Sequence, residues 1–189
     1  MRIKMYLNIY LGVKVNMVIM KQLHSELLLV SLSNYYRTNP MNINTIVDIV
    51  NGKSKLSLRL IDWYVTNYCK NKNVVYLLNK DKNSKYFNVY MNYRSQLKAF
   101  KKIQFDPFRR RDRITFYYGD DEKLYTTLGQ LNFFRWALDN EVIKNLENNI
   151  TLIEKELLLY NNKLDVDKCK QSSIKNMTTF NGNAHISFN

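Results

Sequence analysis

The stretch Ile114-Thr-Phe-Tyr-Tyr-Gly-Asp-Asp-Glu-Lys-Leu-Tyr-Thr-Thr-Leu-Gly-Gln130 decides the fold class of this chain. Two short runs of strand-forming residues lie on either side of Gly119-Asp-Asp-Glu122, which predicts an antiparallel hairpin. Thr127 and Gln130 then have the spacing of a capping box, so a helix is expected to begin here. This change from strand to helix periodicity within one short segment predicts an α+β domain.

Other segments extend this architecture toward the N-terminus. Val74–Leu78 is a predicted strand. Tyr86–Tyr93 is a second one, because Phe87, Val89, Met91 and Tyr93 alternate with polar or aromatic neighbours. Helices are expected over Thr45–Val50 and from Ser54 or Ser57 to Tyr68, and Ser95–Lys102 is also predicted to be helical. The expected fold is therefore a small antiparallel sheet of two hairpins, packed with an N-terminal helical hairpin and a long C-terminal helix.

A heptad-like pattern follows the predicted capping box. Its apolar positions are Ile143, Leu146, Ile150, Ile153, Leu157 and Tyr160. The pattern predicts a helix over residues 141–160 that packs on the domain or pairs with a second copy of the chain. We expect three regions: an N-terminal extension over 1–40, a basic core domain over 41–160 and a polar tail over 161–189. No apolar run is long enough for a membrane span, since lysines interrupt the first 32 residues.

The charge of the chain is unevenly distributed. The formal net charge is +13, but residues 41–118 carry 16 basic and 5 acidic side chains, whereas residues 119–167 carry 5 and 10. One strongly positive face is therefore expected, and such a face attracts polyanions. A solvated basic surface without a partner is the alternative.

The densest basic segment is Arg94–Arg113, which has a net charge of +6 and is interrupted by three phenylalanines. Arginine forks and lysine ammonium groups bind phosphate, and exposed tyrosine rings can stack on bases. The candidate nucleic-acid-binding residues are Arg94, Lys98, Lys101, Lys102, Arg109, Arg110, Arg111, Arg113, Tyr86 and Tyr90. In the alternative interpretation, Asp106 and Asp112 form ion pairs with some of these arginines and brace the turn.

No catalytic residue, metal site or cofactor site is predicted. Cys69, Cys169, His24 and His185 are too far apart in sequence to form a zinc motif, and Gly52-Lys53-Ser54 lacks the first glycine of a phosphate-binding loop. Gly119-Asp120-Asp121 imitates a polymerase metal hairpin but is also ordinary turn sequence. A nuclease-like cluster of Asp112, Asp120, Asp121 and Glu122 is kept as an alternative, so enzymatic activity is left open.

Four longer phrases carry a family resemblance. They are Lys55-Leu-Ser-Leu-Arg-Leu-Ile-Asp-Trp-Tyr-Val-Thr-Asn-Tyr68, Asn92-Tyr-Arg-Ser-Gln-Leu-Lys-Ala-Phe100, Phe105-Asp-Pro-Phe-Arg-Arg-Arg-Asp-Arg-Ile114 and Thr126-Thr-Leu-Gly-Gln-Leu-Asn-Phe-Phe-Arg-Trp-Ala-Leu138. With them the chain resembles an uncharacterised protein family of nucleocytoplasmic large DNA viruses, the mimivirus-like and phycodnavirus-like giant viruses. The similarity covers about Met41–Tyr160 and is not expected in residues 1–40. It implies a viral setting, in the host cytoplasm (viral factory) or the virion, and no residue role.

The combined expectation is a viral, non-enzymatic nucleic-acid-binding protein used in genome handling, transcription or packaging. DNA or RNA is the expected partner, with no membrane and no small-molecule substrate. The alternative is a structural or assembly protein of the virion that acts through protein contacts and oligomerises through its helix over 141–160.

Overall fold

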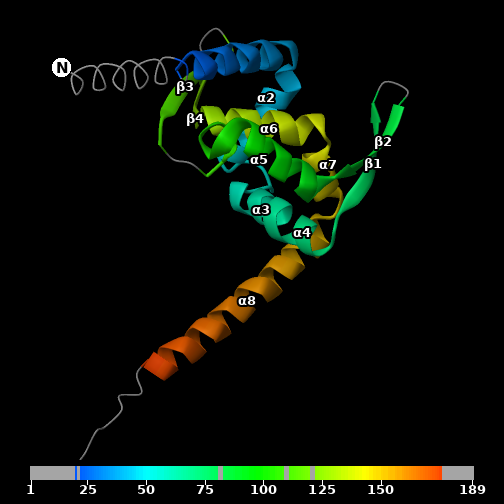
Figure 1. Ribbon diagram of the computed structural model, residues 1–189, viewed down its shortest axis with the longest axis vertical. Coiled ribbons are helices and arrows are strands. Elements are labelled where there is room, and N and C mark those ends of the chain that lie inside the picture. Colours follow the sequence, from blue (N-terminus) through cyan, green and yellow to red (C-terminus); the bar gives the residue numbers. More distant parts are fainter. Residues whose placement is uncertain (1–19, 21, 81–82, 109–110, 120–121, 176–189) are drawn as a thin grey trace, which may run out of the picture. The chain divides into compact units, whose positions relative to one another are not determined.

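The computed structural model describes residue 20 and residues 22–80, 83–108, 111–119 and 122–175. The chain divides into two compact units, Met1–Asn149 and Ile150–Asn189. In the first unit, a helix over residues 22–38 precedes the remaining elements (Figure 1). These are α2 (Pro40–Val50), α3 (Leu58–Trp63), the π-helical turn η1 (Tyr64–Tyr68), α4 (Cys69–Asn71), β1 (Val75–Lys80), β2 (Asn83–Asn88), α5 (Val89–Phe105), β3 (Arg113–Tyr117), β4 (Lys123–Thr127), α6 (Leu128–Asp139) and α7 (Val142–Asn148).

The α+β class is confirmed, and helices dominate it. Each of the two hairpins forms its own antiparallel two-stranded sheet, β1 with β2 and β3 with β4. In the second hairpin Thr115 pairs with Tyr125, and Tyr117 pairs with Lys123. The predicted boundaries of this hairpin are correct to within one residue, because its alternating residues and its turn are local signals.

Helix α6 lies at the centre of the first unit. It begins where the capping box predicts, since the Thr127 side chain accepts a hydrogen bond from the Gln130 amide. Phe133, Phe134 and Ala137 are at most 1% exposed, and Trp136 is 6% exposed. A helix that is apolar on nearly every side belongs in a core. Around it, α5 contributes Tyr93 and Phe105, whose rings contact those of Phe133 and Trp136 at centroid distances of 5.7–6.1 Å.

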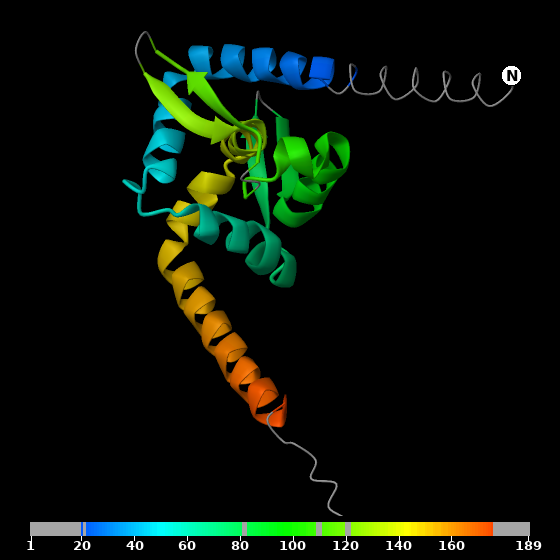
Figure 2. The same cartoon turned by 90° about the vertical axis from the view of Figure 1, so that its left-hand side faces the viewer.

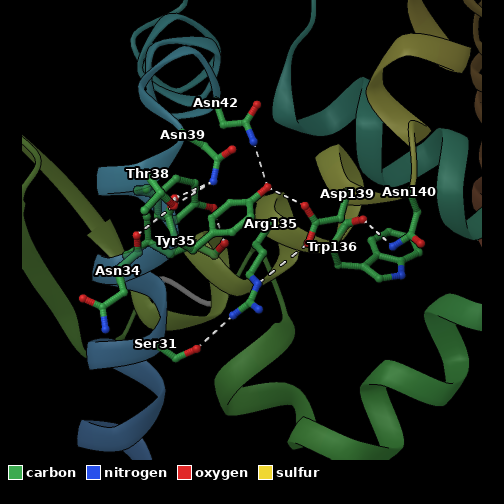
Figure 3. Close-up of polar contacts among 12 residues, drawn as sticks. Ser31, Asn34, Tyr35, Thr38, Asn39, Asn42, Arg135, Trp136, Asp139 and Asn140 are labelled. Atoms are coloured by element: carbon green, nitrogen blue, oxygen red, sulfur yellow. Dashed lines mark hydrogen bonds and ion pairs between the residues drawn. The ribbon is translucent and has the colours of Figure 1, made fainter. Parts of the chain in front are cut away.

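The helix over residues 22–38 packs into the same unit. Leu28, Leu32 and Tyr36 are buried, and the Tyr36 hydroxyl donates a 2.6 Å hydrogen bond to the Leu131 carbonyl of α6. Beside this contact, Tyr35 and Arg135 join a polar network between the two helices (Figure 3). The domain boundary expected after residue 40 stays a prediction, but described residues before it contribute to the core.

The prediction of a strand over Tyr86–Tyr93 is wrong beyond Asn88. The β2 strand ends at Asn88, whose side chain accepts a hydrogen bond from the Met91 amide and so caps α5. Val89 and Tyr93, which are four residues apart, are then buried on one face of the helix. Alternation and helical spacing coincide over these few residues, and the cap decides between them.

The upstream helices also differ in detail. Helix α2 begins at Pro40 rather than near Asn44, because proline suits the first helical position. Ser57 caps α3 as predicted, since its hydroxyl accepts a bond from the Leu60 amide. The helix changes to π geometry at Tyr64 before it ends at Asn71.

The predicted helix over 141–160 is interrupted. Helix α7 ends at Asn148, and α8 (Ile150–Lys175) begins two residues later and forms the described part of the second unit. The heptad-like stripe therefore continues across two helices, and the polar tail is helical through Lys175. The short strand expected near Ile186 and Phe188 lies outside the described residues.

Candidate nucleic-acid interface

Helix α5 carries most of the described candidate cations. Tyr90, Arg94 and Lys98 follow one another at spacings of four residues, so they share one face. Lys101 lies at a break in the helix, where the backbone leaves helical geometry (φ 61°, ψ 165°). An adjacent face buries Val89 and Tyr93 against the core. The side chains of Arg94, Lys98, Lys101 and Lys102 are all exposed. The helix thus presents exposed positive charges to solvent while a different face anchors it.

Among the described side chains, no ion pair with a carboxylate involves these four cations. In the described part of the chain, ion pairs join Arg135 to Asp139 and Lys144 to Glu141, and neither pair lies in the Arg94–Arg113 segment. Arg111 and Arg113 are exposed as well. Arg109 and Arg110 lie outside the described residues. Ion pairing by Asp106, expected as one way to brace the turn, is not found among the described side chains, and the pairing expected of Asp112 stays a prediction.

Tyr90 and Tyr86 occupy different environments. The half-buried Tyr90 ring has the Lys70 ammonium 5.9 Å and the Arg94 guanidinium 6.0 Å from its centroid. Both distances fit cation–π contacts, so Tyr90 helps to hold two cations together. Tyr86 lies on β2 and is 79% exposed. The two rings do not share a strand, as the predicted strand over Tyr86–Tyr93 implied, because Tyr90 belongs to α5.

The turn after α5 is braced by the first turn of α6. Within the turn, the Asp106 carboxylate accepts a 2.9 Å hydrogen bond from the Phe108 amide. The Gln130 side chain donates to the Pro107 carbonyl at 2.9 Å. Gly129 allows close approach, since a Cβ there would lie 2.9 Å from the Asp106 carbonyl oxygen. Of the aromatic residues beside the turn, Phe105 is buried, whereas Phe108 is 40% exposed.

Asp62 lies near this turn. Partial burial, with a smaller contribution from the negative charge of Asp106, raises the pKa of the Asp62 carboxyl to about 6. The nearby carboxylates of Asp62 and Asp106 do not by themselves make a metal site. Among the residues that the structure describes, no three His, Cys, Asp or Glu side chains are grouped so that they could hold a metal ion.

Cys69 is not an activated thiol. Burial raises the pKa of the Cys69 thiol to about 12, so the thiolate is disfavoured at neutral pH. Asp120 and Asp121, the central pair of the nuclease-like alternative, lie outside the described residues, whereas Asp112 and Glu122 are exposed. No helix in the described ranges is long and apolar enough to cross a membrane.

A second set of exposed residues lies on the β3–β4 hairpin and was missed by the sequence reasoning. Tyr117 is 68% exposed and Tyr125 is 61% exposed. The Arg113 guanidinium lies 5.1 Å from the centroid of the Tyr125 ring. The signal was present in the predicted strands, because outward positions 113, 115 and 117 alternate with inward Ile114 and Phe116.

The comparisons with known proteins place the chain in a family. Residues 14–185 match the sequence profile described as "Family of unknown function (DUF7197)". The chain belongs to this family. It is also 34% identical over 128 residues to "Uncharacterized protein L507" of Acanthamoeba polyphaga mimivirus. That alignment covers 65% of this chain and 49% of the relative, so the chain spans about half the length of the viral protein.

The predicted resemblance to an uncharacterised giant-virus family is thereby confirmed. Its expected limit at Met41 is wrong, because the family match begins at residue 14. No solved structure matches the chain.

Proposed function

We propose that this protein is a viral, non-enzymatic nucleic-acid-binding protein that holds DNA or RNA through its phosphates. One observation carries the proposal: the described cations of Arg94–Arg113 are exposed, and ion pairs with described carboxylates do not neutralise them. An exposed basic surface attracts a polyanion and releases the condensed ions of that polyanion on binding.

The proposed binding surface combines two types of contact. Arg94, Lys98, Lys101 and Lys102 on α5, with Arg109–Arg111 and Arg113 after it, would contact phosphates. Lysine acts as a point charge, whereas arginine can bind two phosphate oxygens at once. Tyr90 would keep Arg94 in place, and the exposed ring of Tyr86 would be available to a base. This contact set requires no cofactor and no small-molecule substrate.

Genome handling, transcription or packaging are the proposed roles, in the viral factory of the host cytoplasm or in the virion. The support for this setting is the similarity to the mimivirus protein. Binding that depends on phosphates rather than base edges fits roles in which sequence is not read.

Fluorescence anisotropy with a labelled generic DNA duplex and its RNA equivalent tests the proposal. For about six phosphate contacts, the logarithm of affinity should fall with the logarithm of salt concentration with a slope of about −5. Lys98→Gln/Lys102→Gln should weaken binding about tenfold and reduce the slope by about 2. The matched control, Lys155→Gln/Lys163→Gln on α8, removes the same charge from exposed positions elsewhere. Equal effects of the two double variants, or absence of binding at low salt, would reject the proposal.

Exposed apolar residues favour a second candidate function, assembly of the virion through contacts between copies of the chain. On α8, Leu158 is 62% exposed and Leu159 is 59% exposed. Neighbouring exposed leucines are typical of a contact surface. Analytical ultracentrifugation tests this: Leu158→Ser/Leu159→Ser should shift an oligomer to monomer, and a wild-type monomer at high concentration would rule the candidate out.

A further inference from the structure

We propose that the outer face of the β3–β4 hairpin binds single-stranded nucleic acid by stacking bases on Tyr117 and Tyr125. This inference rests on the proposed function and deepens it, because it names the form of nucleic acid and a second contact surface.

The pairing of the two strands sets the rings side by side. Tyr117 pairs with Lys123 and Thr115 pairs with Tyr125, so the two tyrosines are diagonal neighbours on one face. Diagonal positions in an antiparallel pair are roughly 7–8 Å apart. The inward face differs completely, since Phe116 and Leu124 are 4% and 3% exposed. The centroid of the Phe116 ring lies 5.9 Å from that of Tyr36, a contact that anchors the hairpin. The hairpin lies beside the helix over 22–38 (Figure 2).

The rings border a groove. Its volume is about 410 Å³, and its lining includes Tyr117, Tyr125, Lys123, Thr115 and, from the end of α2, Asn51. The hydroxyl of Thr115 and the amide of Asn51 can hydrogen-bond to base edges. Aromatic walls with a few polar groups are typical of sites that hold flat, polar ring systems.

Cations lie on both sides of the aromatic pair. Arg113 contacts the Tyr125 ring, and Lys123 lies directly opposite Tyr117 across the strands. Arg111, just before β3, extends the charge toward the basic segment. The turn beyond Lys123 is acidic in sequence (Asp120, Asp121 and Glu122), so phosphates are expected to run toward Arg111 and away from the turn.

This arrangement selects single strands over duplexes. Bases in a duplex are stacked on one another and cannot offer their faces to a protein ring, whereas the bases of a single strand can. Paired aromatic platforms beside cations bind single strands with little dependence on sequence, because every base has a flat face. The basic surface of α5 has no exposed aromatic pair of this kind among its described residues and would bind both forms.

Anisotropy with oligo-dT, oligo-U and a DNA duplex tests the inference. Tyr117→Ala/Tyr125→Ala should weaken binding of both single strands by on the order of 100-fold, about tenfold for each ring, and change duplex binding by less than about twofold. The matched control Tyr117→Phe/Tyr125→Phe keeps the rings and should retain single-strand affinity. Circular dichroism confirms that each variant is folded. In the wild-type protein, photocrosslinking to an oligonucleotide with 5-iodouracil should modify Tyr117 or Tyr125.

The two proposals fail in different ways. If the wild-type protein binds neither single strands nor duplex at low salt, the proposed function and this inference both fail. If it binds both forms but the alanine pair leaves single-strand affinity within twofold, with no crosslink at either tyrosine, the proposed function stands and the hairpin site is rejected.

Discussion

The hydroxyl of Tyr35 donates a 2.6 Å hydrogen bond to Oδ1 of Asp139, across 104 positions of sequence (Figure 3). The same hydroxyl accepts a bond from the Asn42 side chain at 2.8 Å, and the Arg135 guanidinium lies over the Tyr35 ring. One tyrosine thus joins the helix over 22–38, α2 and the end of α6. Burial is the main cause of a raised Tyr35 pKa, which keeps the hydroxyl protonated as a donor.

Tyr35→Phe should destabilise the protein by about 1–2 kcal/mol, because Asp139 loses its short bond while the ring packing remains. Urea denaturation of the wild-type and variant proteins measures this difference. Tyr86→Phe removes a hydroxyl from a ring that is 79% exposed and should change the unfolding free energy by less than about 0.5 kcal/mol. Equal effects at the two positions would show that the Tyr35 contact contributes nothing to stability.

The raised pKa of the Asp62 carboxyl determines how folding stability changes with pH. Burial and the charge of Asp106 raise its pKa to about 6 in the folded protein, against about 4 in the unfolded chain. The folded state therefore holds the proton more tightly, so the contribution of this group to stability falls as pH rises from about 4 to about 6.

Asp62→Asn should accordingly stabilise the protein near pH 7 by on the order of 1 kcal/mol, a value reduced for the solvent screening of a half-buried group. The gain should disappear near pH 4, where the wild-type carboxyl is already neutral. Thermal melts across this pH range test it, with Glu147→Gln on α7 as a control at an exposed carboxylate. A stabilisation independent of pH would contradict the assignment.

Lys101 has φ 61° and ψ 165° within α5, a backbone conformation that side chains rarely adopt. Glycine has no Cβ to resist it, so Lys101→Gly should stabilise the fold by about 1 kcal/mol. Lys98→Gly, three residues earlier in regular helix, should instead cost about 1 kcal/mol. Chemical denaturation compares the two, and destabilisation by both would show that position 101 is unstrained.

Local signals explain which parts of the fold could be predicted. The β3–β4 hairpin and the start of α6 depend on residues that are close in sequence, such as Thr127 and Gln130. The predictions of both elements are correct. The predicted strand over Tyr86–Tyr93 is wrong beyond Asn88, since Val89 and Tyr93 fit either period and the Asn88 cap starts a helix. The break at Asn149 was not predictable from the apolar stripe, which continues through it.

In the candidate site, too, some features could be predicted from the sequence and others depend on tertiary packing. Charge is readable from composition, so the cations of Arg94–Arg113 were found, and the described ones are exposed. Which rings face solvent depends on tertiary packing: Tyr90 lies among cations, and Tyr117 and Tyr125 occupy an outward face. The brace between Gly129 and Asp106 joins residues that are 23 positions apart, and no pattern in the sequence indicated it.

That brace supports the last prediction. In an ordinary helix, alanine in place of glycine is favourable by about 1 kcal/mol. At Gly129 the added Cβ would lie 2.9 Å from the Asp106 carbonyl oxygen and 3.3 Å from its amide nitrogen, and neither backbone atom can move independently. Gly129→Ala should therefore destabilise the protein by about 1–3 kcal/mol. Because Asp106 begins the turn that leads into the arginines, the variant should also weaken DNA binding. Ser95→Ala, at an exposed helical position, is the control; a more stable Gly129→Ala protein would show that α5 and α6 are not in close contact at this point.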